Sequence, residues 1–144
     1  MRADARRFEN WENNYAAKLG LGRAIDYALD IGIDAIEQEV TRLAALLRAS
    51  LASVPGVTVH DIGARKCGIV TFSVEAVAAA AIESELREKQ IMVSVSSPAS
   101  TLIDASRRQL PELVRSGVHY FNTEAELDAL VSAVRALSPR AGAH

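Results

Sequence analysis

Apolar residues recur every three or four positions in two stretches of the first third of the chain. The first stripe predicts a helix over residues 19–30, and the second predicts a longer helix over 34–53. Gly32 separates them, and Pro55-Gly56 ends the second helix with a turn. The stripes consist of Leu21, Ala24, Ile25, Ala28 and Leu29, then Ile36, Val40, Leu43, Leu47 and Leu51.

Downstream, the period of the pattern shortens to two, which is typical of strands. An alanine-rich helical stretch and a short turn of helix, which Pro111 stops, interrupt the alternation. A last helix completes the pattern. The predicted strands are 57–62, 68–74, 91–96 and 113–121, and the predicted helical segments are 76–89, 102–110 and 123–137.

This order of elements predicts an α+β fold with a small mixed, mostly antiparallel sheet and helices packed on one face. The expected organisation is a connecting segment over residues 1–18, a domain over 19–138 and a frayed tail over 139–144.

Composition narrows the function classes. The 144 residues carry 16 basic and 18 acidic side chains, which provide no basic field for nucleic acid or an anionic membrane. Cys67 is the single cysteine, so no internal disulfide forms, and the N-terminus lacks the apolar core of a signal peptide. We expect a cytoplasmic location. Because Cys67 directly precedes a buried-looking strand, we expect an inert core thiol.

The last predicted strand carries a permanently charged residue, Arg115, which suggests a functional role. Side chains two apart share a face, so Arg115, Gly117 and His119 point the same way. Gly117 leaves a gap between guanidinium and imidazole through which a small anion can reach Arg115. A guanidinium grips a carboxylate through two parallel hydrogen bonds. The alternative is an edge-strand arginine in water, or one paired with Glu112.

Residues 119–126 form the corner between this strand and the last helix. Thr123 and Glu126 have the spacing of a capping box, and Asn122 suits a tight turn. His119 is open to two interpretations, a strand histidine or a site residue.

No self-contained active site is visible. The chain has no phosphate-binding glycine loop, no GxSxG and no metal-ligand spacing. Asp61, Asp104 and Glu12 are scattered, and we expect them to be solvated.

Several segments, in this order, resemble the C-terminal small domain of class V aminotransferases. These enzymes depend on pyridoxal 5'-phosphate (PLP), have fold type I and include cysteine desulfurase-like and isopenicillin N epimerase-like members. The most specific parts are the RFE start at residues 7–9 and the R-x-x-x-H-x-x-N-T-x-x-E ending from Arg115 to Glu126. The matching segments are ARRFENWE (5–12), 19–57, GIVTFSV (68–74), IMVSVS (91–96) and 114–134.

The resemblance implies that Arg115 holds the substrate's α-carboxylate, with His119 and Asn122 as further substrate-binding candidates. Two departures stand out. Gly117 replaces a common serine, and Asn10 to Asn13 replaces a run that helps hold cofactor phosphate.

PLP chemistry needs a Schiff-base lysine, and none of Lys18, Lys66 and Lys89 matches the family's motif. The chain by itself is therefore predicted to be inactive and to bind no cofactor. Its expected partners are a missing large PLP domain, a small amino-acid substrate and a second copy in a homodimer. The alternative is a free-standing carboxylate-binding or dimerisation domain without catalysis.

Overall fold

The computed structural model describes residues 3–8 and 12–139. Residue contacts divide the chain into two compact units, 1–36 and 37–144. The predicted tail over 139–144 lies almost wholly outside the described residues, and Glu9 to Trp11 of the RFE start lies outside them too.

The first unit holds a short 3-10 turn, Ala5–Phe8, the helix α1, Tyr15–Ile31, and the beginning of α2. The helix α1 begins four residues before its predicted start because Asn14 caps it, accepting a hydrogen bond from the Ala17 amide at 2.9 Å. Gly32 ends the helix with a positive φ of 97°, as the predicted break requires. No residue of α1 is buried.

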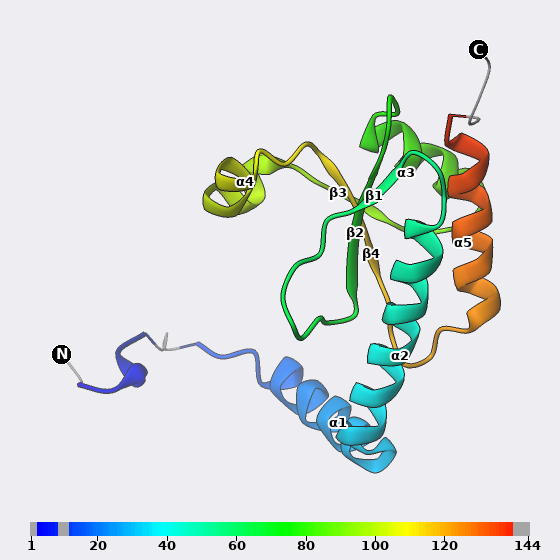
Figure 1. Ribbon diagram of the computed structural model, residues 1–144. Coiled ribbons are helices and arrows are strands. Elements are labelled where there is room, and N and C mark those ends of the chain that lie inside the picture. The colour runs from blue at the N-terminus through cyan, green and yellow to red at the C-terminus, as the bar shows by residue number, and fades with distance from the viewer. Residues whose placement is uncertain (1–2, 9–11, 140–144) are drawn as a thin grey trace. The chain divides into compact units, whose positions relative to one another are not determined.

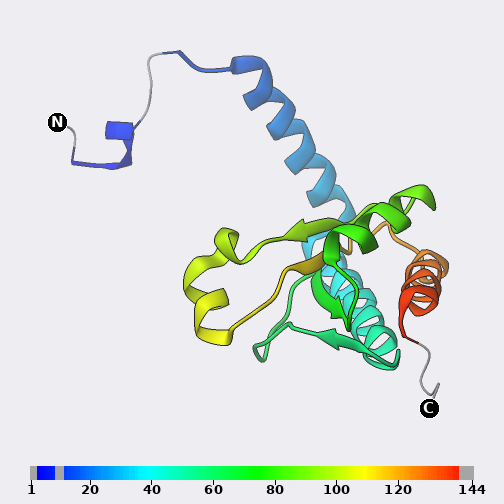
Figure 2. The same cartoon turned by 90° about the horizontal axis from the view of Figure 1, so that it is seen from above.

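The second unit is a four-stranded sheet with helices. The strand order is β1-β2-β4-β3, and all three pairings are antiparallel. Figure 1 shows α2 and α5 on one side of the sheet and α4 beyond the other side, and Figure 2 gives the view from above. The predicted α+β class is confirmed. The remaining elements are α2 (Ile33–Ala52), β1 (Val57–Val59), β2 (Ile69–Val74), α3 (Ala79–Glu88), β3 (Ser94–Ser96), η2 (Pro98–Thr101), α4 (Leu102–Arg108), β4 (Leu113–Gly117) and α5 (Glu124–Leu137).

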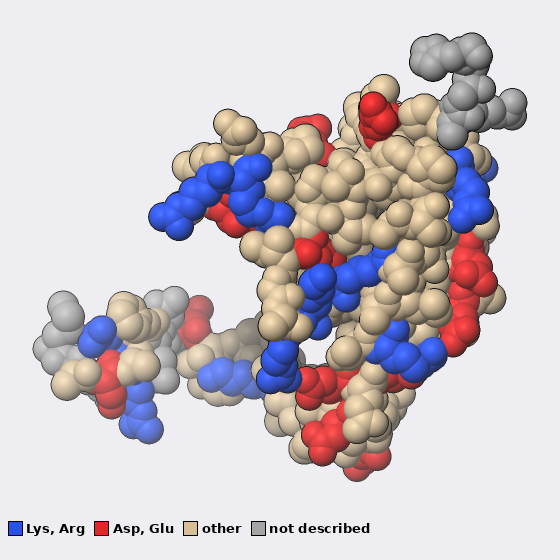
Figure 3. Space-filling view, viewed as in Figure 1, with Lys and Arg blue, Asp and Glu red and all other residues tan. Residues whose placement is uncertain are grey.

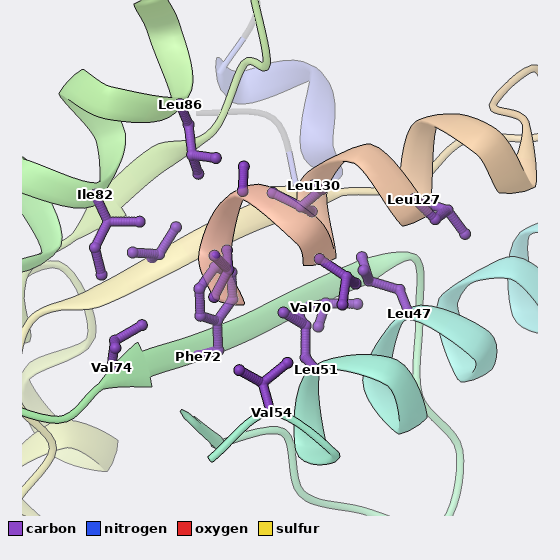
Figure 4. Close-up of a cluster of buried hydrophobic side chains, with 14 of the residues drawn as sticks. Leu47, Leu51, Val54, Val70, Phe72, Val74, Ile82, Leu86, Leu127 and Leu130 are labelled. Atoms are coloured by element: carbon purple, nitrogen blue, oxygen red, sulfur yellow. The ribbon is translucent and has the colours of Figure 1, made fainter. Parts of the chain in front are cut away.

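The core lies between the sheet and the helices α2, α3 and α5. Val114 on β4 is fully buried. So are Phe72 on β2, Leu47 of α2 and Ile82 of α3, which Figure 4 labels. The predicted stripe of α2 contributes its C-terminal half to this core, because Leu43, Leu47 and Leu51 are all buried. Burial of apolar area of this kind is the main stabilising contribution to such a small domain.

Three predicted strands are shorter than the pattern suggested. The last one, predicted over 113–121, ends at Gly117, because the chain turns into the corner before α5. The ladder of β1 ends after Val59 because the Asp61 carboxylate, rather than a backbone carbonyl, accepts from the Thr71 amide at 3.0 Å. In the predicted strand 91–96 only Ser94–Ser96 pair with β4, although Ile91 and Val93 pack against the core as their alternation indicated.

Close packing just before β2 fixes one end of the β2–β4 pair. The Val118 amide donates to the Gly68 carbonyl at 2.7 Å. A Cβ added to Gly68 would collide with the Val118 carbonyl and lie 2.7 Å from Val40 Cγ1. Gly68 is therefore the residue that lets β2, β4 and α2 meet here.

The predicted capping box at the start of α5 is confirmed. The Glu126 amide donates to Thr123 Oγ1 at 3.3 Å, and the Thr123 amide donates to Glu126 Oε2 at 2.8 Å. The final strand and this helix are thus joined by a corner that local hydrogen bonds hold in place.

Replacing Thr123 by alanine is expected to lower the free energy of unfolding by about 0.5–2 kcal/mol, because the Glu126 amide loses its side-chain acceptor and keeps only the Thr123 carbonyl. Thr123→Ser keeps the hydroxyl and is expected to stay close to the parent. Urea denaturation of the three proteins measures the difference. Equal midpoints for the alanine and serine variants would contradict this role.

Candidate functional site

The uncovered face of the sheet carries a row of polar side chains centred on Arg115. In the antiparallel register Thr71 lies opposite Arg115 on one side, and Ser94 lies opposite it on the other. Directly opposed residues project to the same face, so the three side chains form one row across the sheet. Their neighbours Val70, Val114 and Ser116 point the other way and are buried.

Arg115 lies on a central strand, because β4 is hydrogen-bonded to both β2 and β3. The hypothesis of an edge-strand arginine is therefore wrong. The residue is exposed, and among the described residues no hydrogen bond or ion pair involves its guanidinium, including none with Glu112. A cation on the middle strand with no acidic partner in this part of the chain has its full hydrogen-bonding capacity available.

His119 lies on the same side as Arg115, beside the gap at Gly117. A Cβ built on Gly117 would lie 3.8 Å from His119 Nε2 and meet no other atom within 4 Å. The imidazole is exposed and stacks on the Phe121 ring, with the ring centroids 5.2 Å apart. Arg115 and Gly117 share a face of β4 as the alternation predicted, whereas His119 lies beyond the end of the strand and reaches the Gly117 gap from the corner.

The Asn122 side chain, which was predicted to bind substrate, makes its hydrogen bonds within the corner between β4 and α5. Its Oδ1 accepts from the His119 amide at 2.8 Å, and its Nδ2 donates to Glu126 Oε2 at 3.3 Å. These contacts hold the 119–122 turn against α5. Asn122 therefore supports the backbone that carries His119, and its side chain is turned toward the helix.

Next to this row lies a buried polar network that was not apparent from the sequence. Arg48 of α2 donates through Nε to Asp61 Oδ2 at 2.7 Å, and both side chains are nearly buried. Arg48 also donates to the carbonyls of Cys67 and Ile69 at 2.7 and 2.8 Å, while Thr71 Oγ1 donates to Asp61 Oδ1 at 2.5 Å. The expectation that Asp61 is solvated is wrong, because the network encloses it.

This network shapes a recess of about 310 Å³ beside Thr71, to which four basic side chains contribute. Besides Lys66, these are three arginines that each form an ion pair. Arg48 pairs with Asp61, Arg65 pairs with Glu37, and Arg108 of α4 pairs with Asp104 and also donates to the His60 carbonyl. Figure 3, in the view of Figure 1, shows Lys and Arg side chains near the middle of the visible surface with Asp or Glu side chains beside them. Cys67, at the rim, is exposed, so the prediction of a buried core thiol is wrong; the strand begins only at Ile69.

His60, at the end of β1, links the sheet to α4. Its Nε2 lies 2.8 Å from Ser73 Oγ, and its carbonyl accepts from Arg108. Burial, followed by the positive charge of Arg108, lowers the pKa of His60 below its ordinary value of 6.5, although Asp61 opposes this.

Because the pKa of His60 is lower in the folded protein, the unfolded chain binds the proton more readily. The stability that depends on neutral His60 is therefore fully present above pH 6.5 and is lost as the pH falls through the depressed value. We expect the free energy of unfolding to decrease from about pH 7.5 to about pH 5.5, with a shallower slope in His60→Gln. Urea denaturation across this range measures both slopes. Equal slopes in the parent and in His60→Gln would contradict the role of His60 in this pH dependence.

The described residues do not fit a PLP site. A Schiff-base lysine is held out of water so that its amine is reactive, but Lys18, Lys66 and Lys89 are all exposed. Among the residues that the structure describes, no three His, Cys, Asp or Glu side chains come together to hold a metal. In the same part of the chain no helix is long and apolar enough to cross a membrane.

The fold and its open face define a two-layer α+β domain that presents an arginine from its central sheet. The family described as Aminotransferase class-V matches residues 2–130, and the chain belongs to this family of PLP-dependent enzymes. The family resemblance noted in the sequence is thus confirmed.

Individual relatives agree with the family assignment. A cysteine desulfurase of Enterobacter sp. (strain 638) is 32% identical over 129 residues, which cover 90% of this chain and 31% of that protein. The solved cysteine desulfurase from Thermococcus onnurineus NA1 matches with a TM-score of 0.84 at 22% identity, covering 95% of this chain and 34% of that one. The cystine C-S lyase C-DES, solved with its product cysteine persulfide, matches with a TM-score of 0.76 at 24% identity, covering 93% and 32%. The chain thus spans about a third of the length of each of these proteins.

Proposed function

We propose that this chain is the C-terminal small domain of a PLP-dependent class V aminotransferase or lyase, and that Arg115 holds the α-carboxylate of an amino-acid substrate. The observation that carries the proposal is the position of Arg115: exposed on the middle strand, between Thr71 and Ser94, with no acidic partner among the described residues. A planar guanidinium in that setting suits bidentate binding of a carboxylate.

His119 is proposed to line the same site, since it lies beside Gly117 on the face of Arg115. Asn122 contributes through the turn that carries His119. The domain would close over a cofactor held by a large PLP domain, fixing the substrate by its carboxylate so that the reacting bond is correctly oriented. We further propose that the intact enzyme is a homodimer in the cytoplasm.

The names of the relatives favour cysteine-like substrates. They are described as cysteine desulfurases and a cystine C-S lyase, so sulfur-containing amino acids are the first substrates to test. Transamination is the competing reaction for the same carboxylate-binding arrangement.

The test is the visible absorption spectrum of the longest polypeptide that the native gene encodes, purified without added cofactor. The proposal expects the visible band of bound PLP and a change of that band when L-cysteine is added. A colourless protein that stays colourless with added PLP would overturn the enzyme assignment. The free-standing carboxylate-binding domain would then be the better description of the open-face arginine.

A further inference from the structure

Ser116 interrupts the apolar face of β4. It is 6% exposed and is the one polar side chain among the buried residues that the structure describes. Its neighbours on the same face, Val114 and Val118, are buried and apolar, as is Val70 opposite it on β2. A hydroxyl in such a position needs a hydrogen-bond partner.

The Ser116 hydroxyl faces a cavity instead of a protein partner. No side-chain hydrogen bond within the described residues involves it, and none of the polar side-chain atoms sealed from solvent there lacks a partner, so the Ser116 hydroxyl is reached by solvent. Ser116 lines a cavity of about 300 Å³ between the end of β4, the start of α5 and the segment after α3. That volume is at the lower end of the range for small-molecule sites.

The cavity has walls of both apolar and polar side chains, and one charge. Ile91, Leu127 and Leu130 contribute apolar surface, and Glu126 is the only charged residue of the lining. Hydrogen bonds from the Thr123 backbone and then from Asn122 lower the pKa of Glu126, so the carboxylate is ionised at neutral pH.

One oxygen of this carboxylate remains available. Glu126 Oε2 accepts from the Thr123 amide and from Asn122 Nδ2, whereas no hydrogen bond within the described chain reaches Oε1. Glu126 is exposed at the mouth of the cavity, and its negative oxygen beside the three apolar side chains and the Ser116 hydroxyl is complementary to a cation that carries a small apolar body.

We propose that this cavity binds a small primary amine, with its ammonium group on Glu126 Oε1 and its apolar body against Ile91, Leu127 and Leu130. Ser116 and Arg115 are adjacent on β4 and point to opposite faces, so the amine and the proposed carboxylate ligand lie on opposite sides of this strand. The cavity shares Gly117 and Asn122 with the surroundings of His119, but amine binding does not require Arg115 and is tested without it.

The test is a titration of the isotope-labelled 144-residue chain with benzylammonium chloride, followed by amide chemical shifts. Benzyl alcohol is the control, since it has the same shape without the charge. The expected result is a saturable shift confined to the amides of Gly117, Val118 and Leu127, with benzyl alcohol at least about tenfold weaker. The absence of a saturable shift, or equal binding of the two compounds, would overturn the proposal.

Two variants separate binding from folding. Glu126→Gln retains the side-chain oxygen that the capping box needs, and it is expected to keep the helix while binding the amine about tenfold more weakly. Ser116→Val fills the base of the cavity with the residue type found on either side, and it is expected to fold and to lose amine binding. Parent-like affinity in either variant would count against the site.

Discussion

Replacing Arg115 by alanine in the polypeptide that contains this domain and its PLP domain is expected to lower kcat/KM for an amino-acid substrate by about 100-fold or more, chiefly by raising KM. Losing one partner of a desolvated, hydrogen-bonded charge pair costs about 2–5 kcal/mol, and 100-fold corresponds to about 2.7 kcal/mol. Arg115 makes no ion pair in the described part of the domain, so its removal breaks no salt bridge there.

Steady-state kinetics with matched variants give the comparison. Arg115→Lys keeps the charge without the planar fork and is expected to fall between the parent and alanine. Arg87→Ala removes an exposed arginine of α3 that pairs with Glu83, and its kinetics are expected to match those of the parent. Parent-like kinetics for Arg115→Ala would remove this residue from the site.

The second large effect concerns stability. Arg48→Met is expected to lower the free energy of unfolding by about 3–5 kcal/mol, because the Asp61 carboxylate is left nearly buried without its cation. The carbonyls of Cys67 and Ile69 lose their donor at the same time. Urea denaturation of the 144-residue chain measures the loss.

Two further variants test whether the unpaired Asp61 carboxylate causes this loss of stability. Arg65→Met breaks an exposed ion pair with Glu37 and is expected to change stability by less than about 1 kcal/mol. Adding Asp61→Asn to Arg48→Met removes the stranded charge and is expected to recover part of the loss. If Arg48→Met were no more destabilising than Arg65→Met, the Arg48–Asp61 network would not be a stabilising element.

Local patterns predicted the corner of the proposed site well. The spacing of Thr123 and Glu126 indicated a capping box, and the structure has one. The alternation around Arg115 indicated which residues share its face, because side-chain direction in a strand follows from the backbone alone. The start of α1 was missed although Asn14, the N-cap, was visible in the sequence.

Pairings between distant residues could not be predicted in the same way. Whether Arg115 lies at an edge or in the middle depends on β3 pairing with β4, a contact across about twenty residues that no local pattern encodes. Arg48 lies on α2 and Asp61 in the segment after β1, and each has an ordinary sequence environment. Cys67 precedes a buried strand and yet is exposed, because the strand begins only at Ile69.

The most direct test of the carboxylate assignment compares L-cysteine with cysteamine, which is the same molecule without its carboxylate. Apparent affinities would be measured by titrating the visible band of the PLP-containing polypeptide, for the parent and for Arg115→Ala. We expect the parent to prefer L-cysteine by about 100-fold and the variant to bind the two compounds about equally, since the pairwise contribution of guanidinium and carboxylate is then absent. An undiminished preference for L-cysteine in Arg115→Ala would contradict the account.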